Sequence, residues 1–293
     1  MKKSIRIFAV VLCGAALAGA AAWAGSTGPG TAKSEQSETV APDAHGALMA
    51  AAKADALMQV IATEGARHGM GLEAALFPGR GGAGWARRVS VIQAPERLMG
   101  HLAEALRQEL SPADADAIRE FLSGPVGARV VARELEARRA LLDVPSEAEA
   151  EAQRVAEAEP EGPRGALIAE MIETLDLVTI NVSGGMNANY AFYKGLGDGG
   201  GLRDGMTDAE MLAIVRGQEA ELRTAVGAWL QDYLTLAYAP LSDTDLREYL
   251  AFTRSAPGRR YMAAMFQGFG RVFEATSYDL GRAAAEFMTH EDA

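Results

Sequence analysis

Apolar residues recur at helical spacing through most of this chain. From Ala44 onward, alanine-rich segments place their large apolar residues three or four positions apart, as an amphipathic helix requires. No segment alternates apolar and polar residues convincingly. The nearest, Leu177 to Val182, lies within a longer apolar run that starts near Ala166 and is better explained as a buried helix. The pattern therefore predicts an all-α protein with no sheet.

One short pattern occurs twice, in two segments that we call the signature segments, Leu110–Val131 and Leu241–Met262. Each has a Leu-Ser start, an acidic helix, a phenylalanine and then a glycine. The matched residues are Leu110, Ser111, Phe121 and Gly127 in the first segment, and Leu241, Ser242, Phe252 and Gly258 in the second. Such internal similarity indicates a duplicated helical unit.

The boundaries of these helices can be predicted from single residues. Ser111 and Ser242 each precede an aspartate by three positions, and a serine hydroxyl with such an acid caps the start of a helix. Pro125 and Pro257 interrupt the short helices, because proline lacks an N–H group and clashes with the preceding turn. A longer helix follows each break and another precedes each short helix. We therefore expect two tandem helical repeats of three to four helices each.

Composition divides the chain into five parts. Residues 1–24 are predicted to be a signal peptide, 25–43 a disordered leader, 44–143 helical repeat one, 144–164 an acidic linker and 165–293 helical repeat two. The linker is poor in large apolar residues, which fits either a solvated helix or a flexible connection.

The N-terminus has the pattern of an export signal. Three basic residues precede an apolar run, from Ile7 to Ala22, that is shorter than the ~20 residues of a membrane span. Ala22 and Ala24 are small residues at the positions that a signal peptidase reads. We expect cleavage after Ala24 and a periplasmic protein, with a retained anchor as the alternative. Cys13, the only cysteine, lies within this peptide, so no disulfide or thiolate chemistry is expected in the mature chain.

The charge balance narrows the range of partners. The formal net charge is −11, and phosphate binding needs a basic surface, so neither nucleic acid nor anionic lipid is an expected electrostatic partner. We expect an unknown protein or an apolar small molecule instead, with membrane contact only through an uncleaved signal peptide. The two halves are expected to pack together, or to dimerise, through their apolar faces.

The signature segments resemble the bacterial domain-of-unknown-function 2059 family, whose motif is a Leu-Ser/Thr start, an acidic helix, and Phe-Tyr-x-Ser-Pro-x-Gly before a long helix. Leu122 and Thr253 replace the second aromatic residue, and Pro257 lies one place late. The resemblance implies an exported, all-helical protein and assigns no reaction. The residues that carry it are Leu110, Ser111, Phe121, Pro125, Gly127, Leu241, Ser242, Phe252, Ser255 and Gly258.

Two glycine-rich stretches, Gly79–Gly84 and Gly195–Gly200, fit the G-x-G-x-x-G dinucleotide pattern. That fingerprint needs a preceding strand, and none is expected here, so both are interpreted as flexible connections between helices. Asp198 and Asp204 match no calcium repeat. No cofactor is predicted.

No residue pattern indicates catalysis or metal binding either. The four histidines lack ligand spacing, and His45 and His290 fall in ends that are expected to be flexible. There is no G-x-S-x-G elbow, and no carboxylate pair stands out among the many acids. No catalytic or metal-binding residue is predicted. One polar cluster could line a cavity, although a helix end is favoured, and it comprises Asn181, Ser183, Asn187, Asn189 and Tyr190.

The last candidate is an apolar stripe in the second half. It could form an adaptable groove for a partner helix or an acyl chain, although such stripes are usually core. Its members are Met262, Met265, Phe266, Phe269 and Phe273.

These observations favour a non-enzymatic binding or protein-interaction module. The alternatives are a carrier of a lipid or other apolar ligand, and a hydrolase that uses unidentified carboxylates. A solid core with an exposed apolar patch would favour the first, a cavity between helices the second, and a buried acid pair in a cleft the third.

Overall fold

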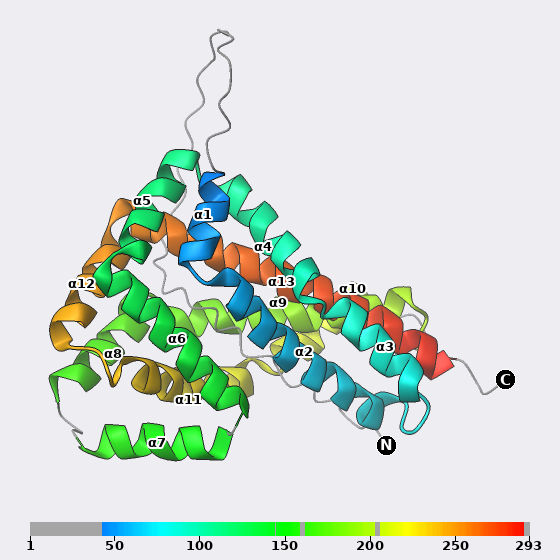
Figure 1. The fold of residues 1–293 in the computed structure, drawn as a ribbon. Coiled ribbons are helices and arrows are strands. Elements are labelled where there is room, and N and C mark those ends of the chain that lie inside the picture. Colours follow the sequence, from blue (N-terminus) through cyan, green and yellow to red (C-terminus); the bar gives the residue numbers. More distant parts are fainter. Residues whose placement is uncertain (1–42, 144, 159–161, 203–205, 290–293) are drawn as a thin grey trace, which may run out of the picture.

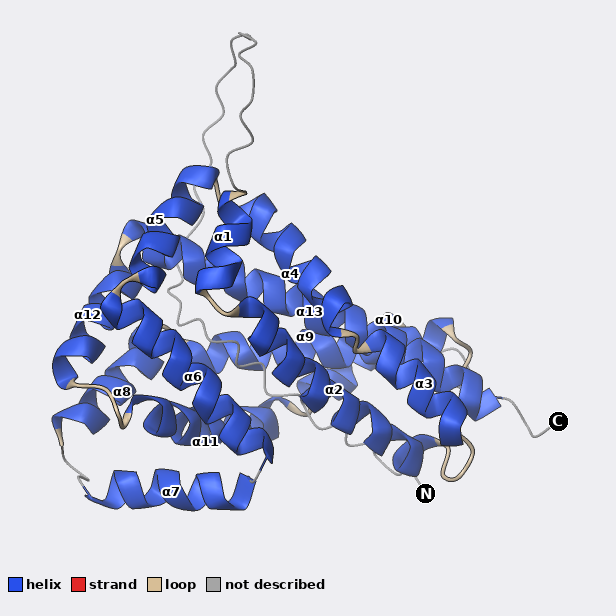
Figure 2. Cartoon of the chain, viewed as in Figure 1, coloured by secondary structure: helices blue, strands red, loops and turns tan. Residues whose placement is uncertain are grey.

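The protein is helical throughout the part that the structure, a computed structural model, describes: residues 43–143, 145–158, 162–202 and 206–289. No strand occurs in these ranges, so the prediction of an all-α fold is confirmed (Figures 1 and 2). The helices are α1 (Ala44–Ala51), α2 (Ala54–Leu76), α3 (Gly82–Ile92), α4 (Pro95–Glu109), α5 (Pro112–Ser123), α6 (Pro125–Asp143), α7 (Pro145–Ala158), α8 (Pro163–Thr174), α9 (Leu177–Asp198), α10 (Asp208–Arg216), α11 (Glu219–Tyr238), α12 (Asp243–Arg254) and α13 (Ala256–Thr289).

The expected capping residues begin the helices to which they were assigned. The Ser111 hydroxyl accepts the N–H of Asp114 at 3.1 Å, and Ser242 accepts the N–H of Asp245 at the same distance. Pro125 lies at the first position of α6, so its missing N–H costs no intrahelical bond. The segment 177–182 begins α9, as the helical interpretation of that apolar run predicted.

The expected three to four helices per half was too few. Within the described ranges, six helices precede α7 and six follow it. Two of the additional breaks lie at residues with left-handed backbone, Lys53 (φ 50°) before α2 and Asp176 (φ 47°) before α9. Neither residue is a glycine or a proline, so the residue type at these positions does not predict that a helix is interrupted there.

The acidic linker contains a helix that packs on the rest of the molecule. In α7, Ala148 is 6 % exposed and Ala152 is 1 % exposed. The helix lies against α6 and α11. Its small alanine side chains let α7 approach these two helices closely. Of the two alternatives for this linker, residues 145–158 therefore form a helix and not a flexible connection.

Helices distant in sequence pack against one another. The long helix α13 runs beside α9 and also beside α4, while α11 lies against α6 and α9 (Figure 1). At the contact between α9 and α13, a Cβ on Gly195 would lie 2.0 Å from the Tyr278 carbonyl oxygen, and one on Gly281 would lie 2.1 Å from that of Phe192. Only glycine permits this approach.

Buried apolar residues form two clusters. The larger one extends through α1, α2, α4–α6, α8, α9, α11 and α12 and the first half of α13. The smaller one, which we call the end cluster, lies where α2, α3, α9 and α10 meet the last part of α13. Trp85 is its centre, fully buried, with its indole N–H donated to the Gly69 carbonyl at 2.9 Å. Phe77 and Phe287 pack on the Trp85 ring.

No helix within the described ranges is both long enough and apolar enough to cross a membrane. The predicted signal peptide, its cleavage residues Ala22 and Ala24, and nearly all of the predicted leader lie outside the described residues.

Candidate functional site

The two signature segments face each other. The rings of Phe121 and Phe252 stack with their centroids 3.8 Å apart and their planes 2° from parallel. Two ion pairs flank this stack: Arg129 to Asp245 at 2.5 Å and Arg260 to Asp114 at 2.8 Å. Each pair joins an acid near the start of one signature segment to an arginine near the end of the other.

These ion pairs affect the capping acids directly. A hydrogen bond from Arg129, with help from Ser242, holds the pKa of Asp245 below its usual range. Bonds from Ser111 and then Arg260 lower the pKa of Asp114 in the same way. Both aspartates therefore stay charged and keep contact with both their serine and their arginine.

The signature glycines are required by close approach between consecutive helices. A Cβ on Gly127 would lie 2.3 Å from the Phe121 carbonyl oxygen, and one on Gly258 would lie 1.9 Å from that of Phe252. Ser255 donates its hydroxyl to the Phe252 carbonyl and accepts the N–H of Gly258. The corresponding break before α6 is formed with Gly124 as the C-cap of α5.

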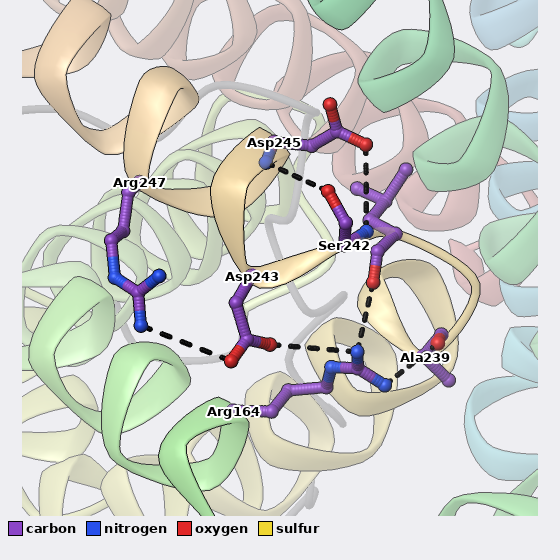
Figure 3. A network of polar contacts seen from close by, with 7 residues as sticks. Arg164, Ala239, Ser242, Asp243, Asp245 and Arg247 are labelled. Carbon is purple, nitrogen blue, oxygen red and sulfur yellow. Dashed lines mark hydrogen bonds and ion pairs between the residues drawn. The ribbon is translucent and has the colours of Figure 1, made fainter.

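The start of α12 is the most elaborate of these junctions (Figure 3). Arg164, at the start of α8, donates to the Ala239 and Leu241 carbonyls, both at 2.9 Å, and lies 3.5 Å from Asp243. Arg247 reaches the same carboxylate at 3.8 Å. Leu110 and Leu241 are each 3 % exposed. The signature residues therefore act as caps, turns and core.

The apolar stripe of α13 is core, as was favoured, and the alternative of a groove is wrong. Its residues are packed inside the protein, and α13 contacts α4, α9 and α12. The exposed fractions are 0 % for Met262, 1 % for Met265, 2 % for Phe269 and 5 % for Phe273, and Phe266 is half-buried.

The glycine-rich stretches do not form a phosphate loop. In the first, the Glu73 carboxylate already accepts the N–H groups of Gly81 and Gly82, at 3.0 and 3.2 Å, and would repel an anion. The second stretch was expected to be a flexible connection, and that expectation is wrong, because Gly195 and Gly197 lie within α9. Asp198 accepts the Tyr278 hydroxyl at 3.0 Å, and Asp204 lies outside the described residues.

The polar cluster lies within α9 and not, as was favoured, at a helix end, and its two buried amides have partners. Asn181 donates to the Leu177 carbonyl at 2.8 Å, and Asn189 donates to Gln218 at 3.0 Å. His45, which was expected in a flexible end, is 7 % exposed and its Nε2 lies 2.9 Å from the Leu110 carbonyl oxygen. Among the described residues, no three His, Cys, Asp or Glu side chains gather as a metal site would require.

Sequence reasoning missed a buried carboxyl group. Glu134 of α6 is 2 % exposed, and Tyr238 of α11 donates its hydroxyl to Oε1 at 2.8 Å. Burial raises the pKa of Glu134 to about 7, although hydrogen bonds from Tyr238 and Tyr249 oppose that rise. Burial and the nearby Glu134 also raise the pKa of Tyr261. A carboxyl group in this setting can exchange a proton near neutral pH.

A buried arginine lies one turn further along α6. Arg138 is 1 % exposed and binds Glu64 through two hydrogen bonds, of 3.0 and 2.6 Å. Its guanidinium carbon also lies 5.8 Å from the centroid of the Trp229 ring. Glu134 and Arg138 continue the four-residue spacing of the buried Val126 and Val130, and this interruption of an apolar row was a signal that the sequence offered.

A surface hollow of about 350 Å³, which we call the α3–α13 cleft, lies between two helices far apart in the sequence. Figure 1 shows α3 beside the last part of α13 at the end of the molecule. Ion pairs join Arg88 to Glu286, at 2.7 Å, and Arg97 to Asp279. The remaining lining residues are Val91, Ile92, Arg282 and Ala283.

Exposed apolar side chains belong to the same end of the molecule. Among the described residues, the large hydrophobic side chains that stay exposed are Met70 (41 %), Val91 (67 %), Leu212 (37 %) and Ile214 (37 %). They lie on α2, α3 and α10, and all three helices contribute to the end cluster. Of the four, Val91 of α3 also lines the cleft.

Comparison of the chain with protein-family models, curated proteins and solved structures finds no match.

Proposed function

We propose that this chain is a non-enzymatic binding protein, exported to the periplasm, and that it binds its partner at the end formed by α3, α10 and the last part of α13. The observation that carries the proposal is the α3–α13 cleft. It combines arginine side chains with an apolar base, and Val91 on its rim is 67 % exposed. Val91 is the most exposed large hydrophobic side chain of the described residues, and a partner that covered it would remove that apolar surface from water.

We further propose that two diverged repeats build this protein. The reciprocal ion pairs between Asp114, Arg129, Asp245 and Arg260 support it, because two equivalent units that meet about a local two-fold axis make each contact twice. The Phe121–Phe252 stack lies where such an axis would pass. The equivalent helix pairings also recur, since α4 packs on α13 and α11 packs on α6.

The hydrolase alternative has less support. Glu134 is the carboxyl group with the most altered environment, and at 2 % exposure it is out of reach of a substrate. The acids of the cleft, Asp279 and Glu286, are each engaged by an arginine. Each of these ion pairs joins α13 to another helix, α3 or α4, which is a structural role.

Native mass spectrometry of the protein, recovered from its own cells without detergent, tests the proposed function. We expect a reproducible bound species on the unaltered protein and its loss from Val91→Asp and from Arg282→Glu. Arg139→Glu, a change at an exposed arginine of α6, should keep the species. A bare protein, or a species that survives both cleft substitutions, would show that this end is not the binding surface.

A further inference from the structure

The α3–α13 cleft has a defined shape because its lining residues follow helical spacing on both sides. On α13, each of Asp279, Arg282, Ala283 and Glu286 has two other lining residues three or four positions away, so they lie on one face. Across from them, Arg88, Val91 and Ile92 lie on one face of α3, and Arg97 closes the end from α4. The cleft is therefore built by three helices rather than by a loop.

Charge within the cleft is unevenly balanced. Arg88 and Arg97 are each matched by an acid on α13, through the ion pairs with Glu286 and Asp279. Arg282 lies between these acids along α13 and brings the lining to three arginines and two carboxylates. The lining thus holds one surplus positive charge, in a chain whose formal net charge is −11. A ligand with one negative charge balances it, whereas a dianion would leave a charge uncompensated.

The uncharged part of the lining is apolar. Ile92 (7 % exposed) and Ala283 (5 % exposed) lie at its base, and Val91 stands at its rim. These side chains offer no hydrogen bond, so the part of a ligand that covers them must itself be apolar. Covering Val91 would also remove the most exposed large hydrophobic side chain of the described residues from water.

The volume limits the size of the ligand. A hollow of about 350 Å³ is at the small end of ligand sites, which span roughly 300–1,000 Å³. At ~30 Å³ for each water-sized group, it has room for about a dozen such groups. That is too small for a two-chain lipid and suits a head group with a short tail.

We infer that the α3–α13 cleft binds a small monoanion with an apolar body, of the size and chemistry of a medium-chain carboxylate. This inference rests on the proposed binding function and names its ligand class. In the complex, the Arg282 guanidinium donates to the carboxylate, and the tail covers Val91, Ile92 and Ala283. Arg88 and Arg97 keep their ion pairs, which hold the two walls of the cleft together.

Calorimetric titration of the purified protein with octanoate tests the inference. We expect one binding site, a loss of affinity of at least about ten-fold on Arg282→Gln, and a similar loss on Val91→Asp. Octan-1-ol, which lacks the charge, and acetate, which lacks the tail, should each bind at least about ten-fold more weakly than octanoate. Both altered side chains are exposed, so the melting temperature should not fall, and Arg139→Gln should bind octanoate normally.

The outcomes separate the ligand class from the function. If octanoate fails to bind, or binds equally well to Arg282→Gln and Val91→Asp, the inferred ligand class is wrong. Should Val91→Asp and Arg282→Glu nevertheless lose a bound species in native mass spectrometry, the binding surface stands and takes another ligand. If the unaltered protein neither binds octanoate nor carries any species, both proposals are overturned.

Discussion

The Tyr238 hydroxyl donates a hydrogen bond of 2.8 Å to the Glu134 carboxyl group, and both side chains are buried. Tyr249, from α12, is a second hydrogen-bond partner of Glu134. Glu134 therefore links α6 to two helices of the second half of the chain, α11 and α12. A buried carboxyl group without a cationic partner is most stable as the neutral acid.

Folding stability should therefore depend on pH through Glu134. Its pKa rises from 4.5 to about 7 on folding, so the folded protein keeps a proton that the unfolded chain has lost. The stabilisation by the neutral acid is complete below pH 4.5 and declines as the pH rises to about 7. At 1.36 kcal/mol for each pKa unit, the decline amounts to roughly 3 kcal/mol.

Glu134→Gln, which fixes the neutral form, should remove that dependence. Urea unfolding at pH 5 and at pH 8 measures it: relative to the unaltered protein, the variant should gain roughly 3 kcal/mol between the two conditions. Glu136→Gln, at an exposed position of the same helix, is the control and should show no such gain. If the variant and the unaltered protein differ in free energy of unfolding by the same amount at pH 5 and at pH 8, the pKa of Glu134 does not change on folding.

Tyr238→Phe should strengthen the pH dependence of stability that Glu134→Gln removes. It deletes a hydrogen bond that lowers the pKa of Glu134, so the stability loss with rising pH should extend to higher pH. The variant should also be about 1–3 kcal/mol less stable at pH 5, because a buried acceptor loses its donor. Tyr261→Phe is the comparison, since Tyr261 is not one of the two hydrogen-bond partners that lower the pKa of Glu134. Equal pH profiles for the two variants would contradict the assigned bond.

The features of the fold that could be predicted from the sequence are those that depend on residues close together in the chain. Helical periodicity, the serine caps and the breaks near Pro125 and Pro257 are local, and the helices begin where Ser111 and Ser242 indicated. The left-handed breaks at Lys53 and Asp176 were missed because neither residue type demands that backbone conformation.

Features that depend on packing between distant segments could not be predicted. The stripe through Met265 and Phe269 was ambiguous between groove and core, since periodicity identifies an apolar face but not what covers it. The α3–α13 cleft joins Arg88 to Glu286, which are 198 residues apart in the chain. Glu134 was detectable in principle, as a charge within a row of buried valines, but one among many acids is a weak signal.

Adding a single methyl group at the signature glycines should be costly. Gly258→Ala places Cβ 1.9 Å from the Phe252 carbonyl oxygen, and Gly127→Ala places it 2.3 Å from that of Phe121, so the backbone must move. We expect each to lower the free energy of unfolding by at least about 2 kcal/mol. Gly270→Ala, on α13 with open space around its Cβ, should instead stabilise by up to about 1 kcal/mol. Urea unfolding that shows the same effect at all three positions would refute the close approach.

The stack of Phe121 on Phe252 should behave as one energetic unit. A double-mutant cycle with Phe121→Ala and Phe252→Ala isolates the interaction between the rings, and we expect a coupling of about 0.5–1.5 kcal/mol. The single change at Phe252, which is 8 % exposed, should cost about 3 kcal/mol or more, and the change at half-buried Phe121 less.

A second cycle provides the reference. Phe121 and Phe287 belong to different clusters, so that pair should be additive within about 0.5 kcal/mol. Additivity in both cycles would show that the signature segments contribute separately to stability. Coupling confined to Phe121 and Phe252 would support the proposal that the two repeats join through these segments, because a contact on a local two-fold axis is shared equally by both units.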